Sequence, residues 1–223
     1  MSNEVSRVGA NRVYYSITEM GKNTVIERLM DVLYVMRYIS IDFLNPYLEE
    51  AVEKAEIKQG ETILDLSSPV MEKLRMKTTE LHKPHGRYLL VNTNPHFADL
   101  LGEWIRSEKR ELVDLLDREQ VERLDVETVD IVLALFNITE INVDWTIDQA
   151  LRLLRKGGKL VICDIAAREE DTIRDDLYKE YMPLHGKSGI DLNLDKKLTE
   201  RGMKALVFER KRGLITGVFQ KEG

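Results

Sequence analysis

Two apolar runs in the second half of the sequence constrain its fold more than any other feature. Residues 130–136 begin with an aspartate and then continue without a polar residue, and residues 159–165 form a second run that is mostly apolar. Strands with such a continuous pattern are buried on both faces, which is typical of parallel sheets covered by helices. The chain is therefore expected to fold around a parallel sheet with helices on both sides of it.

Strand-like and helix-like segments alternate along much of the remaining chain. Further strands are predicted at residues 62–66, 86–92 and 111–116, and helices at residues 47–55, 70–80, 97–107 and 145–154. The C-terminal region differs, because residues 205–209 and 214–219 flank a short turn and so predict an antiparallel hairpin. We expect an α/β fold with a doubly wound, mostly parallel seven-stranded sheet and an antiparallel C-terminal hairpin.

The first part of the chain is predicted to be an N-terminal extension, residues 1–46, that precedes the α/β domain, residues 47–223. Residues 12–18 alternate like a short strand, Thr18 is placed to cap a helix, and Pro46 breaks that helix. Apolar residues recur between them at the helical period, which predicts a long amphipathic helix. Its apolar face either covers the sheet or pairs with another subunit, so we expect a protein partner or self-association, such as a homodimer.

Composition and charge exclude several classes of protein. The formal net charge is −6 and the pI is near 5.4, whereas a duplex-binding surface needs clustered positive charge, so nucleic acid is not an expected partner. No apolar run approaches the roughly 20 residues that span a bilayer, and no secretory signal is expected. The single cysteine, Cys163, cannot form an intrachain disulfide. Together with the lack of a spanning run and of a secretory signal, this predicts a cytoplasmic location. His82 and His85 lack further ligands at metal-binding spacing, so no metal site is expected.

One pair of segments is specific enough to suggest a family. Residues 129–136 give a strand with an early aspartate, and residues 149–162 give a helix that ends in Lys156 and two glycines before another apolar strand. These segments resemble the class I S-adenosylmethionine-dependent methyltransferases, in which a proline usually stands at the position of Lys156. The resemblance covers residues 47–221 and implies a Rossmann-like fold, S-adenosylmethionine as cofactor and transfer of a methyl group.

The loop that binds the cofactor in that family has a different composition here. Family members usually have Asp-x-Gly-x-Gly-x-Gly after the first strand, and residues 65–71 are the matching stretch. Asp65 keeps the acid, but Ser67, Pro69 and Met71 replace the glycines. Glycine allows close approach of the backbone to a ligand, whereas proline removes an amide donor and methionine fills space. We therefore predict that the S-adenosylmethionine site is eroded.

Two further cofactor positions follow from the resemblance. Asn92 stands where the family has the acid that binds the ribose hydroxyls, and Asp117 lies near the position of the acid that contacts the adenine edge. An amide can accept a hydrogen bond but lacks the charge that strengthens it. The cofactor-binding positions implied by the resemblance are Asp65, Ser67, Ser68, Asn92 and Asp117.

The substrate side offers candidates but no catalytic residue. Phe136 and Asn137 follow the strand after which methyltransferases often place substrate-facing groups, and His185 lies in a region where they vary their substrate loops. The Pro-Pro-aromatic motif of amino-group methyltransferases is absent after Phe136, which argues against nucleobase or amide N-methylation. No catalytic base can be assigned from the sequence.

Three hypotheses of function remain open at this point. The first is a methyltransferase-like protein with an eroded S-adenosylmethionine site that acts as an interaction or scaffold subunit. The second is an active methyltransferase that binds the cofactor through a non-standard loop. The third is a regulatory module that senses another small molecule at the same place.

Overall fold

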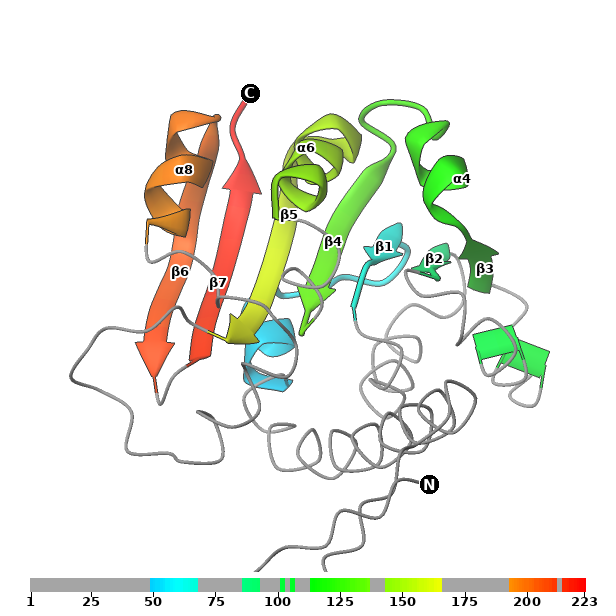
Figure 1. The fold of residues 1–223 in the computed structure, drawn as a ribbon, viewed down its shortest axis with the longest axis horizontal. Coiled ribbons are helices and arrows are strands. Elements are labelled where there is room, and N and C mark those ends of the chain that lie inside the picture. The colour runs from blue at the N-terminus through cyan, green and yellow to red at the C-terminus, as the bar shows by residue number, and fades with distance from the viewer. Residues whose placement is uncertain are drawn as a thin grey trace, which may run out of the picture. The chain divides into compact units, whose positions relative to one another are not determined.

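The computed structural model describes residues 49–67, 86–92, 101–102, 105–106, 113–136, 143–165, 193–211 and 214–223 (Figure 1). All of them belong to one compact unit, Leu44–Gly223. The predicted N-terminal extension, residues 1–46, and the predicted helix at residues 70–80 lie outside the described residues.

Seven strands form one sheet in the order β3-β2-β1-β4-β5-β7-β6. Their bounds are β1 (Ile63–Asp65), β2 (Tyr88–Val91), β3 (Val113–Leu116), β4 (Val129–Leu135), β5 (Leu154–Ile165), β6 (Met203–Lys211) and β7 (Leu214–Lys221). Strands β1 to β5 pair in parallel, and β7 is antiparallel to both β5 and β6. The expected mostly parallel sheet with an antiparallel C-terminal hairpin is confirmed.

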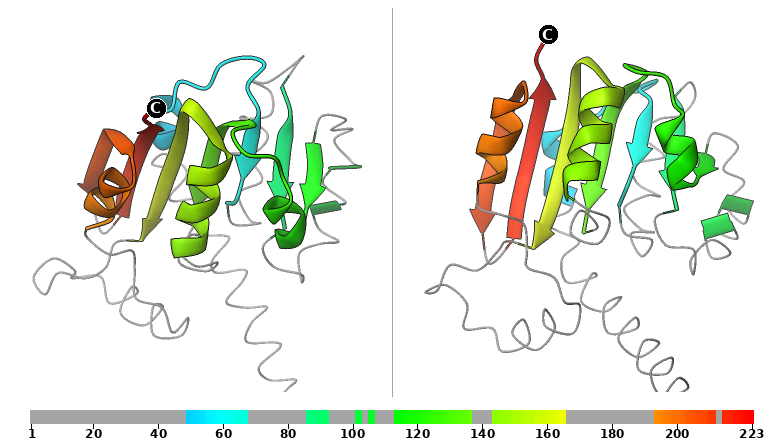
Figure 2. Two further views of the ribbon diagram at one scale, coloured as in Figure 1. Left: turned by 90° about the horizontal axis from the view of Figure 1, so that it is seen from above. Right: turned by 45° about the horizontal axis from the view of Figure 1, so that its top comes forward.

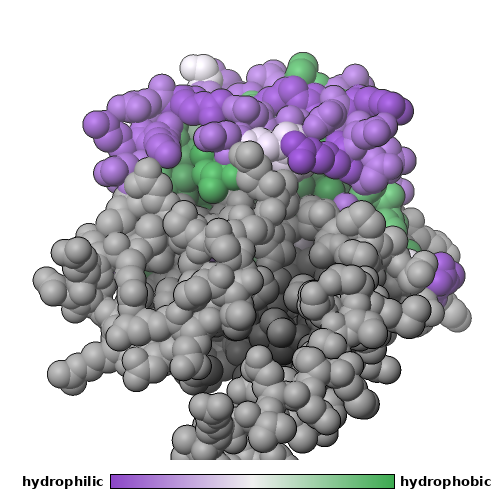
Figure 3. Space-filling model, viewed as in Figure 1, coloured by the Kyte–Doolittle hydropathy of each residue, from purple (hydrophilic) through white to green (hydrophobic). Residues whose placement is uncertain are grey.

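Helices lie on both faces of this sheet, as a doubly wound fold requires. Helices α4 (Arg118–Glu122), α6 (Val143–Leu153) and α8 (Leu194–Glu200) cover one face, and the helical residues 49–54 lie against the other (Figures 1 and 2). The outward face of α4, α6 and α8 is mainly hydrophilic, with apolar residues between the helices (Figure 3). In the part of the chain that the structure describes, every helix is too short or too polar to cross a bilayer.

Strand β4 forms the centre of the core. All its residues from Val129 to Leu135 are buried, and it pairs with β1 on one side and β5 on the other. Side chains from neighbouring strands and from the helices complete the packing around it. Among them are Leu64, Leu89, Ile147, Leu153, Leu160, Ile162, Leu198, Ile215 and Phe219. The continuous apolar pattern of residues 130–136 thus corresponds to a strand covered on both faces.

The double glycine lies within β5 and not, as its position after a helix suggests, in a turn ahead of the strand. Helix α6 ends at Leu153, and the next residue already pairs with Val129 of β4. The register then shifts, so that Lys159 pairs with Ile131 and the intervening residues bulge out of the ladder. Gly157 has φ +78, a backbone conformation that favours glycine.

Two short helices, α4 and α8, were not predicted from the sequence. Helix α4 begins with a capping box, in which the Asp117 carboxylate accepts the Gln120 N–H at 2.8 Å and the Gln120 side chain accepts the Asp117 N–H at 2.7 Å. A helix of 5 residues is too short to show a hydrophobic period, so its capping residues are the signal that the sequence offers.

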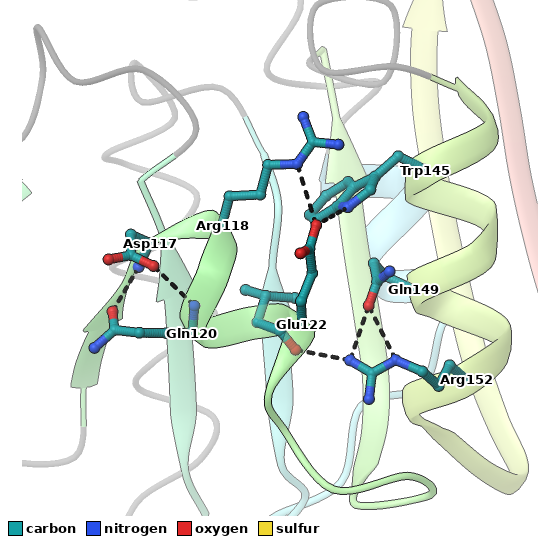
Figure 4. A network of polar contacts seen from close by, with 8 residues as sticks. Asp117, Arg118, Gln120, Glu122, Trp145, Gln149 and Arg152 are labelled. Carbon is teal, nitrogen blue, oxygen red and sulfur yellow. Dashed lines mark hydrogen bonds and ion pairs between the residues drawn. The ribbon is translucent and has the colours of Figure 1, made fainter.

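Polar contacts fix α4 against α6 (Figure 4). The Arg152 guanidinium donates to the backbone oxygens of Leu124 at 2.5 Å and of Val121 at 2.7 Å, near the C-terminal end of α4. Glu122 accepts the indole N–H of Trp145 at 2.9 Å, and the Arg118 guanidinium lies 4.6 Å from the centre of that ring. Carbonyls at a helix end lack partners within the helix, and Arg152 gives those of Val121 and Leu124 a charged donor, in addition to the Leu124 N–H that Val121 accepts at 3.2 Å.

The contacts of Arg152 predict a measurable contribution to stability. Arg152→Met keeps most of the side-chain volume but removes the donors, and is expected to lower the free energy of unfolding by about 2 kcal/mol. Arg123→Met is the matched control, since the Arg123–Glu119 pair has side chains that are 76% and 79% exposed. It should change stability by less than about 0.5 kcal/mol. Urea denaturation measures both, and equal effects of the two substitutions would contradict the assignment.

The bulge in β5 predicts that Gly158 cannot be replaced without strain. A Cβ at Gly158 would lie 2.9 Å from the backbone oxygen of Asp130 and 3.0 Å from that of Arg155. We expect Gly158→Ala to destabilise the protein by about 2 kcal/mol in thermal or urea unfolding.

Gly102→Ala is the control for this substitution. The atom nearest to its added methyl group is on the flexible guanidinium of Arg106, at 3.3 Å. Because Gly102 is helical, alanine there should be neutral or stabilising by about 0.5 kcal/mol. A Gly158→Ala protein as stable as Gly102→Ala would show that the bulge tolerates a side chain.

Candidate functional site

The strand order defines where a ligand is expected to bind. Strand β1 pairs with β2 on one side and with β4 on the other, so the direction in which the chain winds reverses between β1 and β4. In open α/β sheets, ligands bind beyond the carboxyl ends of the strands at such a switch point. We therefore define the switch-point cluster as Asp65, Ser67 and Leu135, which lie at the carboxyl ends of β1 and β4, together with Tyr88, the first residue of β2, whose hydroxyl reaches Asp65.

Asp65 is the last residue of β1 and lies inside the protein, with 1% of its surface exposed. Its Oδ1 accepts the backbone N–H of Ser67 at 2.8 Å. Its Oδ2 accepts the phenolic O–H of Tyr88 at 2.6 Å. Each carboxylate oxygen therefore has a donor from within the chain, which offsets the cost of burying the group.

Ser67 connects the segment after β1 to β4. It is buried, and its Oγ accepts the backbone N–H of Leu135 at 3.3 Å. Leu66 precedes it and donates its N–H to the backbone oxygen of Leu133 at 2.8 Å. The position at which the family resemblance expects the first glycine is therefore filled by a side chain that bonds across the switch point.

Asn92 and Asp117 lie at the ends of the neighbouring strands. The half-buried Asn92 follows β2 and donates its backbone N–H to Leu116 of β3 at 2.8 Å, which brings it close to the start of α4. Asp117 is exposed, and its Oδ1 caps α4 through Gln120. The structure thus brings Asn92 and Asp117 to one edge of the sheet and gives Asp117 a structural role.

Phe136 has an uncommon backbone conformation at the carboxyl end of β4. Its φ is 54, in the left-handed region that bulky side chains seldom adopt. The residue is buried, and its N–H donates to the backbone oxygen of Cys163 at 2.7 Å. Such strain costs on the order of 1–3 kcal/mol and clusters at functional sites.

Strand β5 contributes two further buried groups at this edge. Burial raises the pKa of the Cys163 thiol to about 12, so the thiol is neutral at physiological pH and is no nucleophile. Its Sγ lies 3.7 Å from the Oγ1 of Thr216. Asp164, the next residue, is also buried. Cys163 is thus a buried core thiol.

Some expected site residues cannot be compared with the structure, and others were missed. Ser68, Asn137 and His185 lie outside the described residues, as do His82 and His85. Tyr88 and Asp164 were interpreted only as strand residues, although a buried tyrosine hydroxyl requires a partner and could have drawn attention to Tyr88. Within the described ranges, no three His, Cys, Asp or Glu residues are grouped so that they could hold a metal ion.

Sequence comparisons identify no relative. No family model matches the chain, and no curated protein matches it.

Solved structures, in contrast, share its fold. A SAM-dependent methyltransferase from Aquifex aeolicus is 16% identical, with TM-score 0.58 over 77% of this chain and 87% of that one. Geranyl diphosphate C-methyltransferase from Streptomyces coelicolor A3(2) is 8% identical, with TM-score 0.64 over 80% and 78%. The cyclase SpnF is 14% identical, with TM-score 0.63 over 78% and 79%. The chain therefore has the fold of the class I S-adenosylmethionine-dependent methyltransferases.

Proposed function

We propose that this protein is a methyltransferase-fold protein whose S-adenosylmethionine site has eroded, and that it acts as an interaction or scaffold subunit. The observation that supports this most is the state of Asp65. Both of its carboxylate oxygens accept hydrogen bonds from within the chain, and its side chain is buried.

The residues at the switch point do not fit the cofactor that the resemblance implies. The family's glycines leave room for a ligand to approach the backbone, because they have no Cβ. Ser67 has both a Cβ and a hydroxyl, and that hydroxyl already bonds to β4. A ligand in this position would have to displace a buried hydrogen bond between the two central strands.

The second strand supports the same proposal. Asn92 supplies an amide where the family supplies a carboxylate, so its bond to a ribose hydroxyl would lack the strength that charge provides. Asp117 is already engaged in capping α4. Four of the positions that the resemblance assigns to the cofactor, Asp65, Ser67, Asn92 and Asp117, thus have altered chemistry or internal partners.

A scaffold role agrees with how the domain is stabilised. Strand β4 is buried along its whole length, and the core around it is continuous from β1 to β7. Internal donors satisfy Asp65, so the charge at the centre of the sheet does not depend on a ligand. A domain built in this way can fold without the cofactor. Its function as a scaffold then lies in the contacts that its surface makes. The N-terminal helix expected from the sequence is our candidate for the contact with a partner or a second copy.

Phe136 favours a second candidate, an active methyltransferase with a non-standard cofactor loop. Its left-handed backbone, at φ 54, lies at the carboxyl end of β4, where ligands bind in this class of fold. Strain of this kind is often retained at binding sites because the surrounding structure compensates for it. Asp65 also remains in place at the end of β1. A sensor of another small molecule would use the same position.

Calorimetric titration distinguishes these functions. If the site has eroded, S-adenosylmethionine and S-adenosylhomocysteine should release no binding heat up to about 1 mM, a limit that corresponds to about −4 kcal/mol of binding free energy. Asp65→Ala serves as the control. Micromolar binding that Asp65→Ala abolishes would refute the proposal and establish a working cofactor site.

A further inference from the structure

Strand β6 lies at one edge of the sheet. It comes last in the strand order, and within the sheet that the structure describes it pairs with β7 alone (Figure 1). It has 9 residues, whereas β3 at the opposite edge has 4. The outer side of an edge strand presents backbone N–H and C=O groups to which another strand can bond. The length of β6 allows a second strand to pair along it.

The middle of β6 is a short apolar stretch between two charges of opposite sign. It runs from Ala205 to Phe208, with Lys204 before it and Glu209 after it, and we call residues 204–209 the edge segment. Among the described residues, Leu206 is one of two large apolar side chains that are exposed, at 42%. Short segments with high β-propensity, little net charge and no proline pair readily with identical segments. The edge segment has all of these properties.

Lys204 and Glu209 lie on the same face of the sheet. Their partners in β7 are Gln220 and Thr216, which are an even number of positions apart, and residues opposite each other in a ladder share a face. A regular strand would put Lys204 and Glu209 on opposite faces, because they are an odd number of positions apart. The register between β6 and β7 shifts within the edge segment, and this bulge brings both charges to one face.

We propose that the edge segment pairs in antiparallel fashion with the edge segment of a second copy of this chain, so that the two sheets continue into one. A two-fold axis between Leu206 and Val207 places Lys204 of each copy opposite Glu209 of the other. The apolar stretches of the two copies then lie against each other, and their exposed surface is removed from water.

The charges favour a second copy in this orientation. Charged residues on an edge strand usually repel an incoming strand. Here the two signs stand at opposite ends of the apolar stretch, so antiparallel pairing forms two Lys–Glu pairs, whereas parallel pairing would set like charges side by side. Opposite charges across a ladder stabilise the pairing of strands, and like charges weaken it.

Both charged side chains are accessible to a second copy. Lys204 is exposed, and the side chain of Glu209 is 51% exposed. Glu209 also accepts a hydrogen bond from Lys54 at 3.1 Å through Oε1. A carboxylate can accept several donors, so Glu209 can contact Lys54 and the second copy together.

The test is sedimentation equilibrium of the full chain over a series of concentrations. A single strand pair is small beside the roughly 1,600 Å² that stable complexes bury, so we expect a reversible dimer of twice 25.8 kDa. Lys204→Glu sets two pairs of glutamates against each other and should weaken the dimer at least about tenfold. Glu209→Lys should weaken it as much, because lysines then oppose each other.

Arg123→Glu is the matched control. It makes the same change of charge as Lys204→Glu, at a side chain that is 76% exposed. Arg123 follows α4, which comes after β3 at the opposite edge of the sheet. The dimer should therefore be unchanged in this variant.

A mixture of the two charge reversals tests the register. A Lys204→Glu copy and a Glu209→Lys copy have opposite charges at both ends of the paired segments, so the mixture should form a heterodimer about as stable as the wild-type dimer. Urea denaturation checks that each variant is folded, since Glu209→Lys also loses its contact with Lys54. If Glu209→Lys does not fold, Leu206→Lys replaces it, and its lysine at the exposed edge should also weaken the dimer.

Three results would overturn the inference. The first is a wild type that stays monomeric up to about 1 mM. The second is a dimer that Lys204→Glu leaves unchanged, which would place the contact between copies elsewhere on the chain. The third is a dimer that both reversals weaken but that their mixture does not restore, because Lys204 and Glu209 would then not face each other.

This inference names the partner for the interaction role in the proposed function and rests on that role. Calorimetric titration of the same preparations with S-adenosylhomocysteine separates the two. A monomer that binds no S-adenosylhomocysteine would overturn the contact through β6 and leave the eroded site in place. A dimer that Lys204→Glu weakens and that binds S-adenosylhomocysteine with micromolar affinity would overturn the eroded site and support the contact through β6.

Discussion

The burial of β4 on both faces is the constraint on which the rest of this structure depends. Every residue from Val129 to Leu135 is covered, so helices must pack on both sides of the sheet, and the connections between parallel strands must cross over those faces. Because β4 pairs with β1 and not with the preceding strand β3, the winding reverses beside it. The carboxyl ends of β1 and β4 therefore meet at the place where this class of fold binds its ligands.

The position at the carboxyl ends of β1 and β4 also determines which hydrogen-bond partners the polar residues need. Asp65 ends β1 next to β4, which is buried along its whole length, and is itself buried, so its carboxylate needs partners whether or not a ligand is present. In this chain the partners are a backbone N–H and a tyrosine hydroxyl, and Ser67 adds a hydrogen bond to β4. The same edge of the sheet that resembles a cofactor site is thus held together by contacts within the protein. The hydrogen bonds between its polar groups stabilise the fold, and any ligand must compete with those hydrogen bonds.

The sequence predicted the architecture because a long strand or helix has a hydrophobic pattern that can be recognised without knowledge of its tertiary contacts. The apolar runs at residues 130–136 and 159–165, the helix before Lys156 and the C-terminal hairpin all correspond to elements of the sheet or its cover. Short elements were missed, since α4 and α8 have too few residues for a periodic pattern to emerge. The bulge at Gly157 was interpreted as a turn, because pairing between Leu154 and Val129 is a tertiary contact that local sequence does not specify. The candidate site shows the same limit. Asp65 and Ser67 were identified through the family resemblance, whereas Tyr88 was missed because its partner, Asp65, belongs to another strand.

The most direct test of this account is a crystal structure of the wild-type protein grown with saturating S-adenosylhomocysteine. The account predicts that Tyr88 still donates to Asp65, that Ser67 still bonds to Leu135, and that no nucleoside lies beyond the carboxyl ends of β1 and β4. S-adenosylhomocysteine bound there, in contact with Asp65, would contradict the account and identify the protein as one that binds the cofactor.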